Sequence, residues 1–333
     1  MRTHFSPIKN PLPHSFPLPK HLNEFADEGV KLIPISLFDH RFPNMKRVVA
    51  AAMLEKAKIQ GELNGKKTII EATSGNTGAA LGMVAPFYGI RKVLAVVKWD
   101  TAPGKLEQLR FFGVQPLFPD PEYKLSPVEE ARRLAALHED YFNPDQYRNT
   151  ANWEAHFEYN GPHVWSETGG KITVFCAAMG TTGTIVGIGK FLRAQCARVN
   201  YTRRNLTIMG GVLAPGHAIP GVRTEAELQP DFKWRDAIDK LFHVEMKDSY
   251  RASREMCQIG EMYGPSSGVS LVTARQAVRY LKENKILDRY RNEDGEVVVG
   301  FTCGDGPHPY YEKYSKDLDS RDMEPLDPAC ITD

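Results

Sequence analysis

Apolar residues along the chain fall into short continuous runs separated by longer segments of mixed composition. In the first half, the continuous runs predict strands at 67–73, 92–99 and 114–118, with helices at 76–89 and 103–113 between them. Wholly apolar strands separated by helices are typical of a parallel sheet that is covered on both faces. The first half therefore predicts one such sheet.

The same alternation restarts in the second half of the chain. Strands are predicted at 172–179, 205–214 and 296–303, and helices at 183–196, 252–264 and 267–285. Two runs of this kind predict an α/β protein with two doubly wound parallel-sheet domains.

The first forty residues differ from the rest because they are rich in proline. This composition favours an extended arm that lies on another part of the protein or on a partner subunit. A helix is predicted to follow at 46–63, where alanine, leucine, glutamate and lysine predominate. The polar end from about Asp317 is expected to be loosely ordered.

Composition and charge narrow the class of function. The 333 residues carry 42 basic and 41 acidic side chains, so the net charge of +1 provides no field that would attract nucleic acid or an anionic membrane. A small-molecule substrate is expected. The five cysteines are scattered and lack CxxC spacing, which indicates a reducing compartment. No apolar run approaches the roughly 18 residues that cross a bilayer, so we expect a cytoplasmic protein.

Three polar features stand at the ends of predicted strands or helices. The first is the loop Thr73-Ser74-Gly75-Asn76-Thr77-Gly78, between a strand and a helix. Its hydroxyls and free amides suit a carboxylate, although a plain capped turn has the same composition.

The second feature is the loop Gly180-Thr181-Thr182-Gly183-Thr184, again between a strand and a helix. Successive amides and three hydroxyls can hold a phosphate group with the help of the helix dipole. The loop lacks the lysine of a Walker A motif and the GxGxxG spacing of a dinucleotide loop, which disfavours nucleotides. A capped turn is again the alternative.

The third feature is Lys46, which opens the helix that follows the loop at 40–45. A helix N-terminus disfavours a positive charge, so a lysine there is more readily present as a nucleophilic amine. A solvated surface lysine is the alternative.

Taken together and in this order, the three features resemble the fold type II enzymes that use pyridoxal phosphate (PLP). Within them the chain is similar to cysteine synthase, also called O-acetylserine sulfhydrylase, and to the catalytic core of cystathionine β-synthase, over roughly residues 15–314. The resemblance implies that PLP lies in a cleft between a smaller domain at 44–147 and a larger domain formed by 1–43 and 148–333. It also implies a homodimer.

The resemblance assigns a role to each matching residue. Lys46 would form the Schiff base with PLP and act as the catalytic base. The remaining cofactor contacts would come from Asn76 at the ring hydroxyl, Ser266 at the ring nitrogen, and Gly180, Thr181, Thr182, Gly183 and Thr184 at the phosphate. The substrate carboxylate would be held by Thr73, Ser74, Thr77 and Gln146. The hydroxyl of Ser266 suits an unprotonated ring nitrogen.

The reaction implied is β-replacement on an activated serine-type amino acid, by way of an aminoacrylate. Three alternatives stay open: β-elimination or deamination of serine, threonine or cysteine; a non-catalytic family member that binds a partner; and a nucleotide-binding oxidoreductase. The last is disfavoured because GxGxxG is missing.

The sequence also departs from the family pattern. Arg47-Val48 follows the lysine where Asp-Arg is usual, Thr182 replaces a common glycine, and GFTCGDGPHPYY replaces a serine-containing strand end. In that last segment Cys303, Asp305 and His308 could suggest a metal site, but a Gly/Pro-rich strand-end loop is the favoured interpretation and no metal is expected. Cys176 is interpreted as a buried small hydrophobe.

Overall fold

The structure is a computed structural model that describes residues 12–39, 42, 44–73, 75–198, 205–319 and 322. Contacts within the chain divide these residues into two compact units. The smaller unit contains the described part of His40–Ala155, and the larger unit contains Leu12–Asp39 and the described part of His156–Asp333. The domain predicted from the sequence, 44–147, begins and ends within the range 40–155 of the smaller unit.

The smaller unit is built on a sheet of four parallel strands in the order β4-β3-β2-β5. The strands are β2 (Thr68–Ala72), β3 (Lys92–Val96), β4 (Val114–Leu117) and β5 (Tyr141–Phe142). The helices are α1 (Lys46–Ile59), α2 (Asn76–Val84), η3 (Ala85–Tyr88), α3 (Pro103–Phe111), α4 (Pro127–Leu137) and α5 (Ala151–Ala155).

Both faces of this sheet are covered. Ile69 points into a core with residues of α1 and α2, whereas the next residue, Ile70, points into a separate core with residues of α4. Side chains alternate between the two faces of a strand, so a strand buried on both sides must be apolar throughout. This explains the continuous apolar runs.

The larger unit is built on five parallel strands in the order β1-β9-β6-β7-β8. The strands are β1 (Val30–Ser36), β6 (Val174–Ala178), β7 (Thr207–Leu213), β8 (Lys240–Val244) and β9 (Val297–Cys303). The α- and π-helices are η4 (His156–Asn160), α6 (Gly161–Glu167), α7 (Gly183–Arg198), α8 (Trp234–Ala237), α9 (Met246–Gln258), α10 (Pro265–Glu283) and α11 (Tyr311–Asp317). The 3-10 helices are η1 (Lys20–Leu22), η2 (Ala26–Glu28), η5 (Glu225–Glu227), η6 (Leu287–Tyr290) and η7 (His308–Tyr310).

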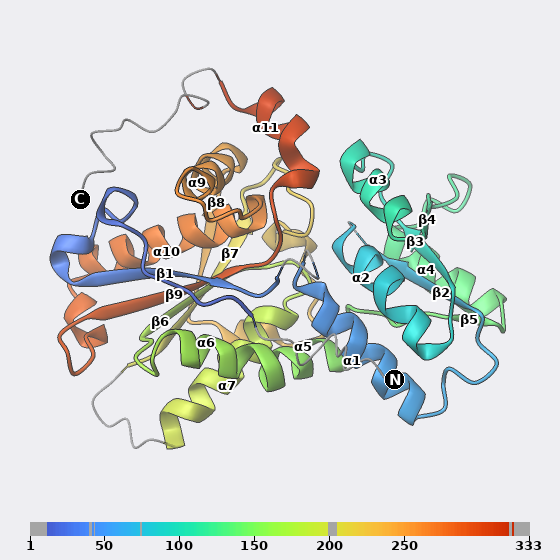
Figure 1. Cartoon of the computed structure of the whole chain (residues 1–333), viewed down its shortest axis with the longest axis horizontal. Helices are drawn as coiled ribbons and strands as arrows, with labels where there is room; N and C mark the ends of the chain where they lie inside the picture. The colour runs from blue at the N-terminus through green and yellow to red at the C-terminus, as the bar shows by residue number, and fades with distance from the viewer. Residues whose placement is uncertain are drawn as a thin grey trace. The chain divides into compact units, whose positions relative to one another are not determined.

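Helices cover both faces of the larger sheet as well. Within this unit, α9 and α10 lie on one side of the strands and α6 and α7 on the other (Figure 1). The predicted α/β architecture with two doubly wound parallel sheets is confirmed. Among the described residues, no helix combines the length and apolar character needed to span a membrane.

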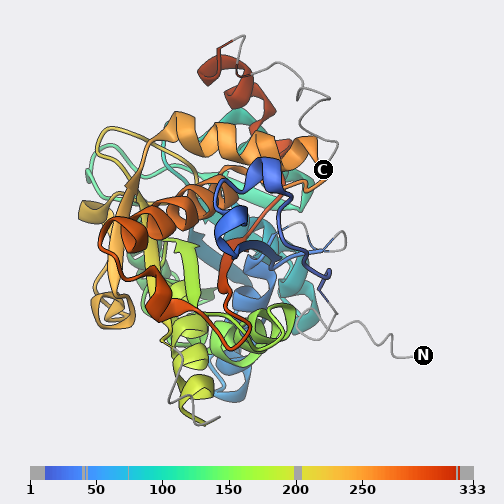
Figure 2. The ribbon, with the colours of Figure 1, turned by 90° about the vertical axis from the view of Figure 1, so that its left-hand side faces the viewer.

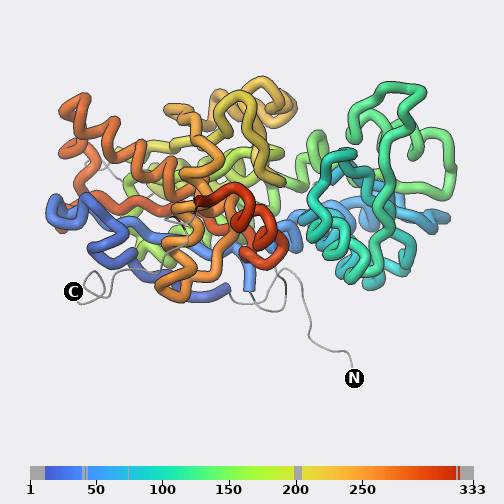
Figure 3. Tube along the Cα trace, turned by 90° about the horizontal axis from the view of Figure 1, so that it is seen from above, coloured from blue at the N-terminus to red at the C-terminus, as the bar shows by residue number. Residues whose placement is uncertain are grey.

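The proline-rich start of the chain behaves differently from the prediction. The sequence predicted an extended arm. Instead, residues 30–36 form the edge strand β1, which pairs with β9 of the same chain. Figure 2 and Figure 3 show this blue segment beside the orange-red strand from the other end of the chain. An edge strand tolerates Pro34, because the missing backbone N–H can lie on the side without a neighbouring strand. Residues 1–11 lie outside the described residues.

Candidate active site

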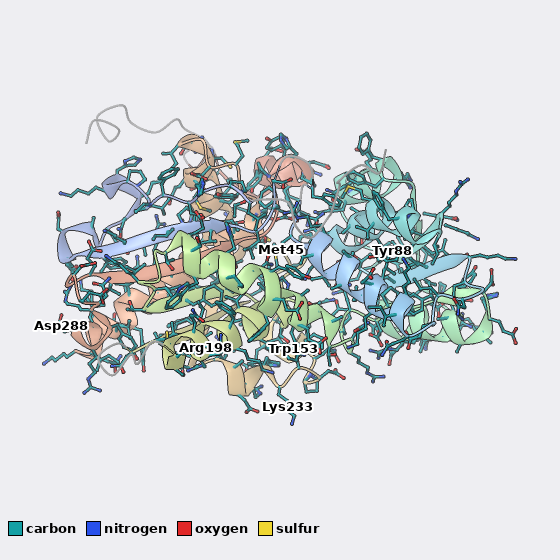
Figure 4. All side chains as sticks on the ribbon, turned by 60° about the horizontal axis from the view of Figure 1, so that its bottom comes forward. Met45, Tyr88, Trp153, Arg198, Lys233 and Asp288 are labelled. Carbon is teal, nitrogen blue, oxygen red and sulfur yellow. The ribbon has the colours of Figure 1, made fainter. Side chains whose placement is uncertain are left out.

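Lys46 is the first residue of α1, directly after Met45, which is labelled in Figure 4. The side-chain oxygen of Asn44 accepts a hydrogen bond from the Lys46 amide at 3.0 Å and fixes the start of the helix. Burial lowers the pKa of the Lys46 amine to about 8, because the charged form loses its hydration. Within the part of the chain that is described, no hydrogen-bond partner of its Nζ is found. The amine is thus suited to nucleophilic attack.

The loop after β2 is shaped by the hydroxyl of Thr73. Its Oγ1 accepts hydrogen bonds from the amides of Gly75 at 3.0 Å and Gly78 at 3.2 Å. Gly75 has a φ of 128°, a conformation that requires glycine. Asn76 and Thr77 are therefore held at the first turn of α2. Ser74, the other carboxylate ligand predicted in this loop, lies outside the described residues.

Gln146 is joined to the same loop by side-chain hydrogen bonds. Its Oε1 accepts from the hydroxyl of Thr77 at 2.7 Å, and its Nε2 donates to the carbonyl of Ala72 at 2.6 Å. Gln146 and Thr77 are almost fully buried. The structure therefore brings Thr73, Thr77 and Gln146 into one hydrogen-bonded cluster at the carboxyl end of β2, although Gln146 lies 69 residues beyond Thr77.

A buried lysine supports this loop. Lys105 on α3 is 1% exposed, and its Nζ donates to the Oδ1 of Asn76 at 2.6 Å. The side chain of Lys105 passes so close to Gly75 that a Cβ there would lie 2.9 Å from the Lys105 Cδ. Lys105 therefore fixes the position of the Asn76 amide oxygen, and with it the orientation of the Asn76 side chain. This contact was not predicted from the sequence.

In the larger unit, the loop between β6 and α7 has little space for side chains. A Cβ on Gly180 would lie 2.1 Å from the carbonyl oxygen of Gly221, so this position requires glycine. Thr182 has a φ of 67°, a left-handed conformation that is strained for a β-branched residue. Its hydroxyl is buried and has no hydrogen-bond partner among the described residues. A buried hydroxyl without a partner on a loop of amides is a position for an anion.

His156 orients a hydroxyl of this loop. The histidine is fully buried, and its Nδ1 lies 2.7 Å from the Nδ2 of Asn160 while its Nε2 lies 3.2 Å from the Oγ1 of Thr184. If Nδ1 accepts from the Asn160 amide, Nε2 carries the proton and donates to Thr184. The Thr184 hydroxyl hydrogen is then left for another acceptor. His156 begins the π-helical turn η4 and was not predicted as a site residue.

Ser266 stands in the first turn of α10, next to the ends of β6 and β9. The hydroxyl of Ser270, one turn further on, accepts from the amide of Ala178 at 3.0 Å and lies 3.3 Å from the Thr302 hydroxyl. The Ser266 hydroxyl itself donates to Asp305 at 2.9 Å. Three segments distant in sequence thus meet at the carboxyl edge of this sheet.

Each unit holds residues that suit one part of a phosphate ester that carries an aldehyde. In the larger unit, the loop at 180–184 offers amides and the buried hydroxyl of Thr182 for a phosphate. In the smaller unit, Lys46 offers an amine of lowered pKa for an aldehyde. Among the described residues, no group of three or more His, Cys, Asp or Glu side chains is placed to hold a metal ion. Cys176 is fully buried, and burial raises the pKa of its thiol.

Comparisons with known proteins agree with this chemistry. The sequence profile of the family described as "Pyridoxal-phosphate dependent enzyme" matches residues 40–287, and the chain belongs to this family. Its relatives include cysteine synthases. The chain is 32% identical to cysteine synthase B of Salmonella typhimurium over 268 residues, which cover 79% of this chain and 81% of that protein. It is also 32% identical to the cysteine synthase of Aquifex aeolicus over 260 residues, covering 77% of this chain and 75% of the relative.

A solved structure shows the same fold. O-acetylserine sulfhydrylase isoform 3 of Entamoeba histolytica superposes with a TM-score of 0.74 at 20% identity, covering 96% of this chain and 93% of that one. The sequence-based predictions of the family, of PLP as cofactor and of a cysteine synthase-like enzyme are confirmed. The roles of individual site residues stay predictions.

The contact between Lys105 and Asn76 yields a first prediction. Lys105→Met keeps an unbranched side chain of nearly the same length but removes the charged amine that holds the Asn76 oxygen, so the Asn76 amide can turn. We expect the affinity for PLP to fall about tenfold or more, because a hydrogen bond to a charged group contributes about 1.5–3 kcal/mol. The visible spectrum of the bound cofactor should also change.

Titration of the cofactor-free variant with PLP, followed by absorbance, measures both effects. Lys67→Met is the matched control, because Lys67 is exposed on the same unit. Wild-type affinity together with a wild-type spectrum in Lys105→Met would show that Lys105 does not position Asn76.

Proposed function

We propose that this enzyme replaces the acetate group of O-acetylserine with sulfide or a related thiol, forming cysteine or an analogue. The observation that carries the proposal is the 32% identity to two cysteine synthases over more than three quarters of the chain. When bound, the cofactor supplies an electron sink that makes the Cα hydrogen of the amino acid acidic and the group on Cβ able to leave.

The residues of the smaller unit would handle the amino acid. Thr73 and Thr77, fixed by the loop amides and by Gln146, would hold its carboxylate. The Lys46 amine, released from the cofactor by the substrate, would take the proton from Cα. Because its pKa is about 8, a larger fraction of this amine is neutral near pH 7 than of an ordinary lysine amine. Only the neutral amine can accept the Cα proton.

The residues of the larger unit would hold the cofactor. The amides and hydroxyls from Gly180 to Thr184 would bind its phosphate, with the Thr184 hydroxyl oriented by His156. The start of α7 adds its dipole to this interaction. Ser266 would meet the ring nitrogen.

β-Elimination is the second candidate reaction. It is kept because the loop around Lys46 departs from the family pattern at Arg47 and Val48, both of which are buried. A non-catalytic role is less well supported, because the Lys46 amine keeps the lowered pKa of a reactive lysine.

Incubation of the enzyme with O-acetylserine separates these reactions. With sulfide present, β-replacement yields cysteine and acetate; without sulfide, little pyruvate should form. Pyruvate and ammonia at equal rates with and without sulfide would establish elimination instead. Absence of both products would favour the non-catalytic role.

We further propose that the protein is a cytoplasmic homodimer. The family resemblance supports the dimer. The four cysteines in the described residues are all free thiols, which is compatible with a reducing compartment.

The lowered pKa of Lys46 predicts how cofactor-free protein takes up PLP. Only the neutral amine attacks the aldehyde, and burial lowers the pKa from 10.5 to about 8. Raising the pH through about 8 should therefore accelerate uptake to a plateau. An ordinary lysine is only about 0.3% neutral at that pH, compared with about half for Lys46.

Stopped-flow absorbance over a series of pH values measures this rate. A midpoint close to 8 is expected. A rate that keeps rising towards the ordinary lysine value of 10.5 would mean that the Lys46 amine is solvated in the cofactor-free protein.

A further inference from the structure

Asp305 forms a buried hydrogen-bonded group with two hydroxyls. Its Oδ1 accepts from the Ser266 hydroxyl at 2.9 Å, and its Oδ2 accepts from the Tyr310 hydroxyl at 2.7 Å. Asp305 is 2% exposed and Tyr310 is 1% exposed. We call these three residues the carboxylate triad. It lies wholly within the larger unit.

The backbone holds this group in place. The amide of Gly264, directly before α10, donates to the carbonyl of Asp305 at 2.7 Å. A Cβ on Gly264 would lie 2.8 Å from the Asp305 Oδ1, so glycine permits the carboxylate to approach the start of α10. These backbone contacts therefore hold the Asp305 carboxylate within hydrogen-bonding distance of Ser266.

The single hydrogen of the Ser266 hydroxyl determines whether Ser266 donates or accepts a hydrogen bond with a ligand. A serine hydroxyl has one hydrogen and two lone pairs. Here the hydrogen is directed to Asp305, so the oxygen is left as an acceptor. A ring nitrogen in contact with that oxygen forms a hydrogen bond only if the nitrogen carries a proton.

We propose that the carboxylate triad holds the pyridine nitrogen of the cofactor in its protonated form. The inference rests on the proposed function, which places the ring nitrogen at Ser266. It reverses the expectation from Ser266 alone, which favoured an unprotonated nitrogen. A negative charge one hydroxyl away favours the positive pyridinium in a site shielded from water.

A protonated ring withdraws electrons more strongly than a neutral one. The charge left at Cα after proton loss is then better stabilised. The enzyme should therefore exchange the Cα hydrogen of amino acids that have no leaving group, such as L-alanine, with solvent. Asp305 acts in this process through Ser266 and is a positioning residue, not a catalytic one.

The test uses holoenzyme loaded with PLP labelled with ¹⁵N in the ring, and reads the ¹⁵N chemical shift. This shift differs strongly between protonated and unprotonated pyridine and does not depend on turnover. We expect the protonated range in the wild type and the unprotonated range in Asp305→Asn, whose amide has nearly the same shape but can donate to Ser266. Cα exchange of L-alanine in deuterated water should fall in the same variant.

Two further variants serve as a control for the Asp-to-Asn change and as a second way to break the contact between Ser266 and Asp305. Asp288→Asn makes the same chemical change at an exposed position on η6, labelled in Figure 4, and should keep the wild-type shift. Ser266→Ala, at a partly exposed position, breaks the link to Asp305 and should also give the unprotonated range. It provides this result even if Asp305→Asn fails to fold.

The outcomes are distinguishable. An unprotonated wild type, or Asp305→Asn with the nitrogen still protonated, overturns the role of Asp305 while leaving the proposed reaction intact. If the wild type is protonated and Ser266→Ala leaves the ¹⁵N shift unchanged, the ring nitrogen does not lie at Ser266, and the proposed cofactor placement fails with the inference. Cysteine formation by the wild type is scored separately and tests the proposed reaction.

Discussion

Lys46→Ala is expected to abolish cysteine formation, lowering kcat by at least about 10³–10⁴-fold, because the proposed attachment point of the cofactor and the proposed base for the Cα proton would both be lost. Lys46 is the first residue of α1, where alanine is compatible with the helix. The variant should therefore fold. Steady-state assay with O-acetylserine and sulfide measures the loss.

The stability of this variant provides an independent check. In the wild type without cofactor, burial disfavours the charged amine, so the folded state binds a proton less tightly than the unfolded state. This penalty is fully present below pH 8 and fades as the pH rises towards 10.5. Cofactor-free Lys46→Ala should gain stability relative to the wild type below pH 8 and lose that advantage above it.

Lys58→Ala is the matched control for both measurements, because Lys58 is exposed on the same helix. It should keep wild-type turnover and show no such dependence on pH. Full activity of Lys46→Ala would refute the assignment of the reactive amine.

Gly180→Ala is the second substitution for which a large effect is expected. The new Cβ would lie 2.1 Å from the carbonyl oxygen of Gly221, so one of the two backbone segments must shift. The shift would displace the amides of the loop that begins at Thr181. We expect PLP affinity to fall about 100-fold or more, since losing two hydrogen bonds to a charged group costs about 3 kcal/mol or more.

Gly189→Ala serves as the control in the following helix. The nearest atom to a Cβ at Gly189 is 3.5 Å away, an ordinary contact, and alanine favours a helix by about 1 kcal/mol over glycine. Gly189→Ala should bind PLP like the wild type. Equal PLP affinity in both variants, measured by equilibrium titration, would show that the loop at 180–184 does not grip the phosphate.

The strands at the centre of each sheet were predictable because both of their faces are buried. Of the four edge strands in the described residues, β4 was predicted, but β1, β5 and β8 were not. β1 contains Pro34 and follows a proline-rich segment, β8 is mostly half-buried, and β5 has only two residues. An edge strand has one neighbour, so its sequence is less constrained to be apolar.

The glycine- and threonine-rich loops of the site were predictable because each joins a buried strand to a helix within a few residues. The residues that support them were not. His156 lies 28 residues from Thr184, Lys105 lies 29 from Asn76, and Asp305 lies 39 from Ser266. Only the folded chain brings such pairs together, and neither a histidine after a short helix nor a lysine within a helix is unusual in sequence.

The pairing of β1 with β9 has a consequence for synthesis on the ribosome. The described residues of the smaller unit all fall between residues 40 and 155, and its strands can associate as soon as residue 142 has emerged. β1 is made first but can join its sheet only after β9, which begins at Val297, has been translated. The smaller unit can therefore fold early during synthesis. The strand β1, although translated before it, stays unpaired with β9 until nearly the whole chain has been made.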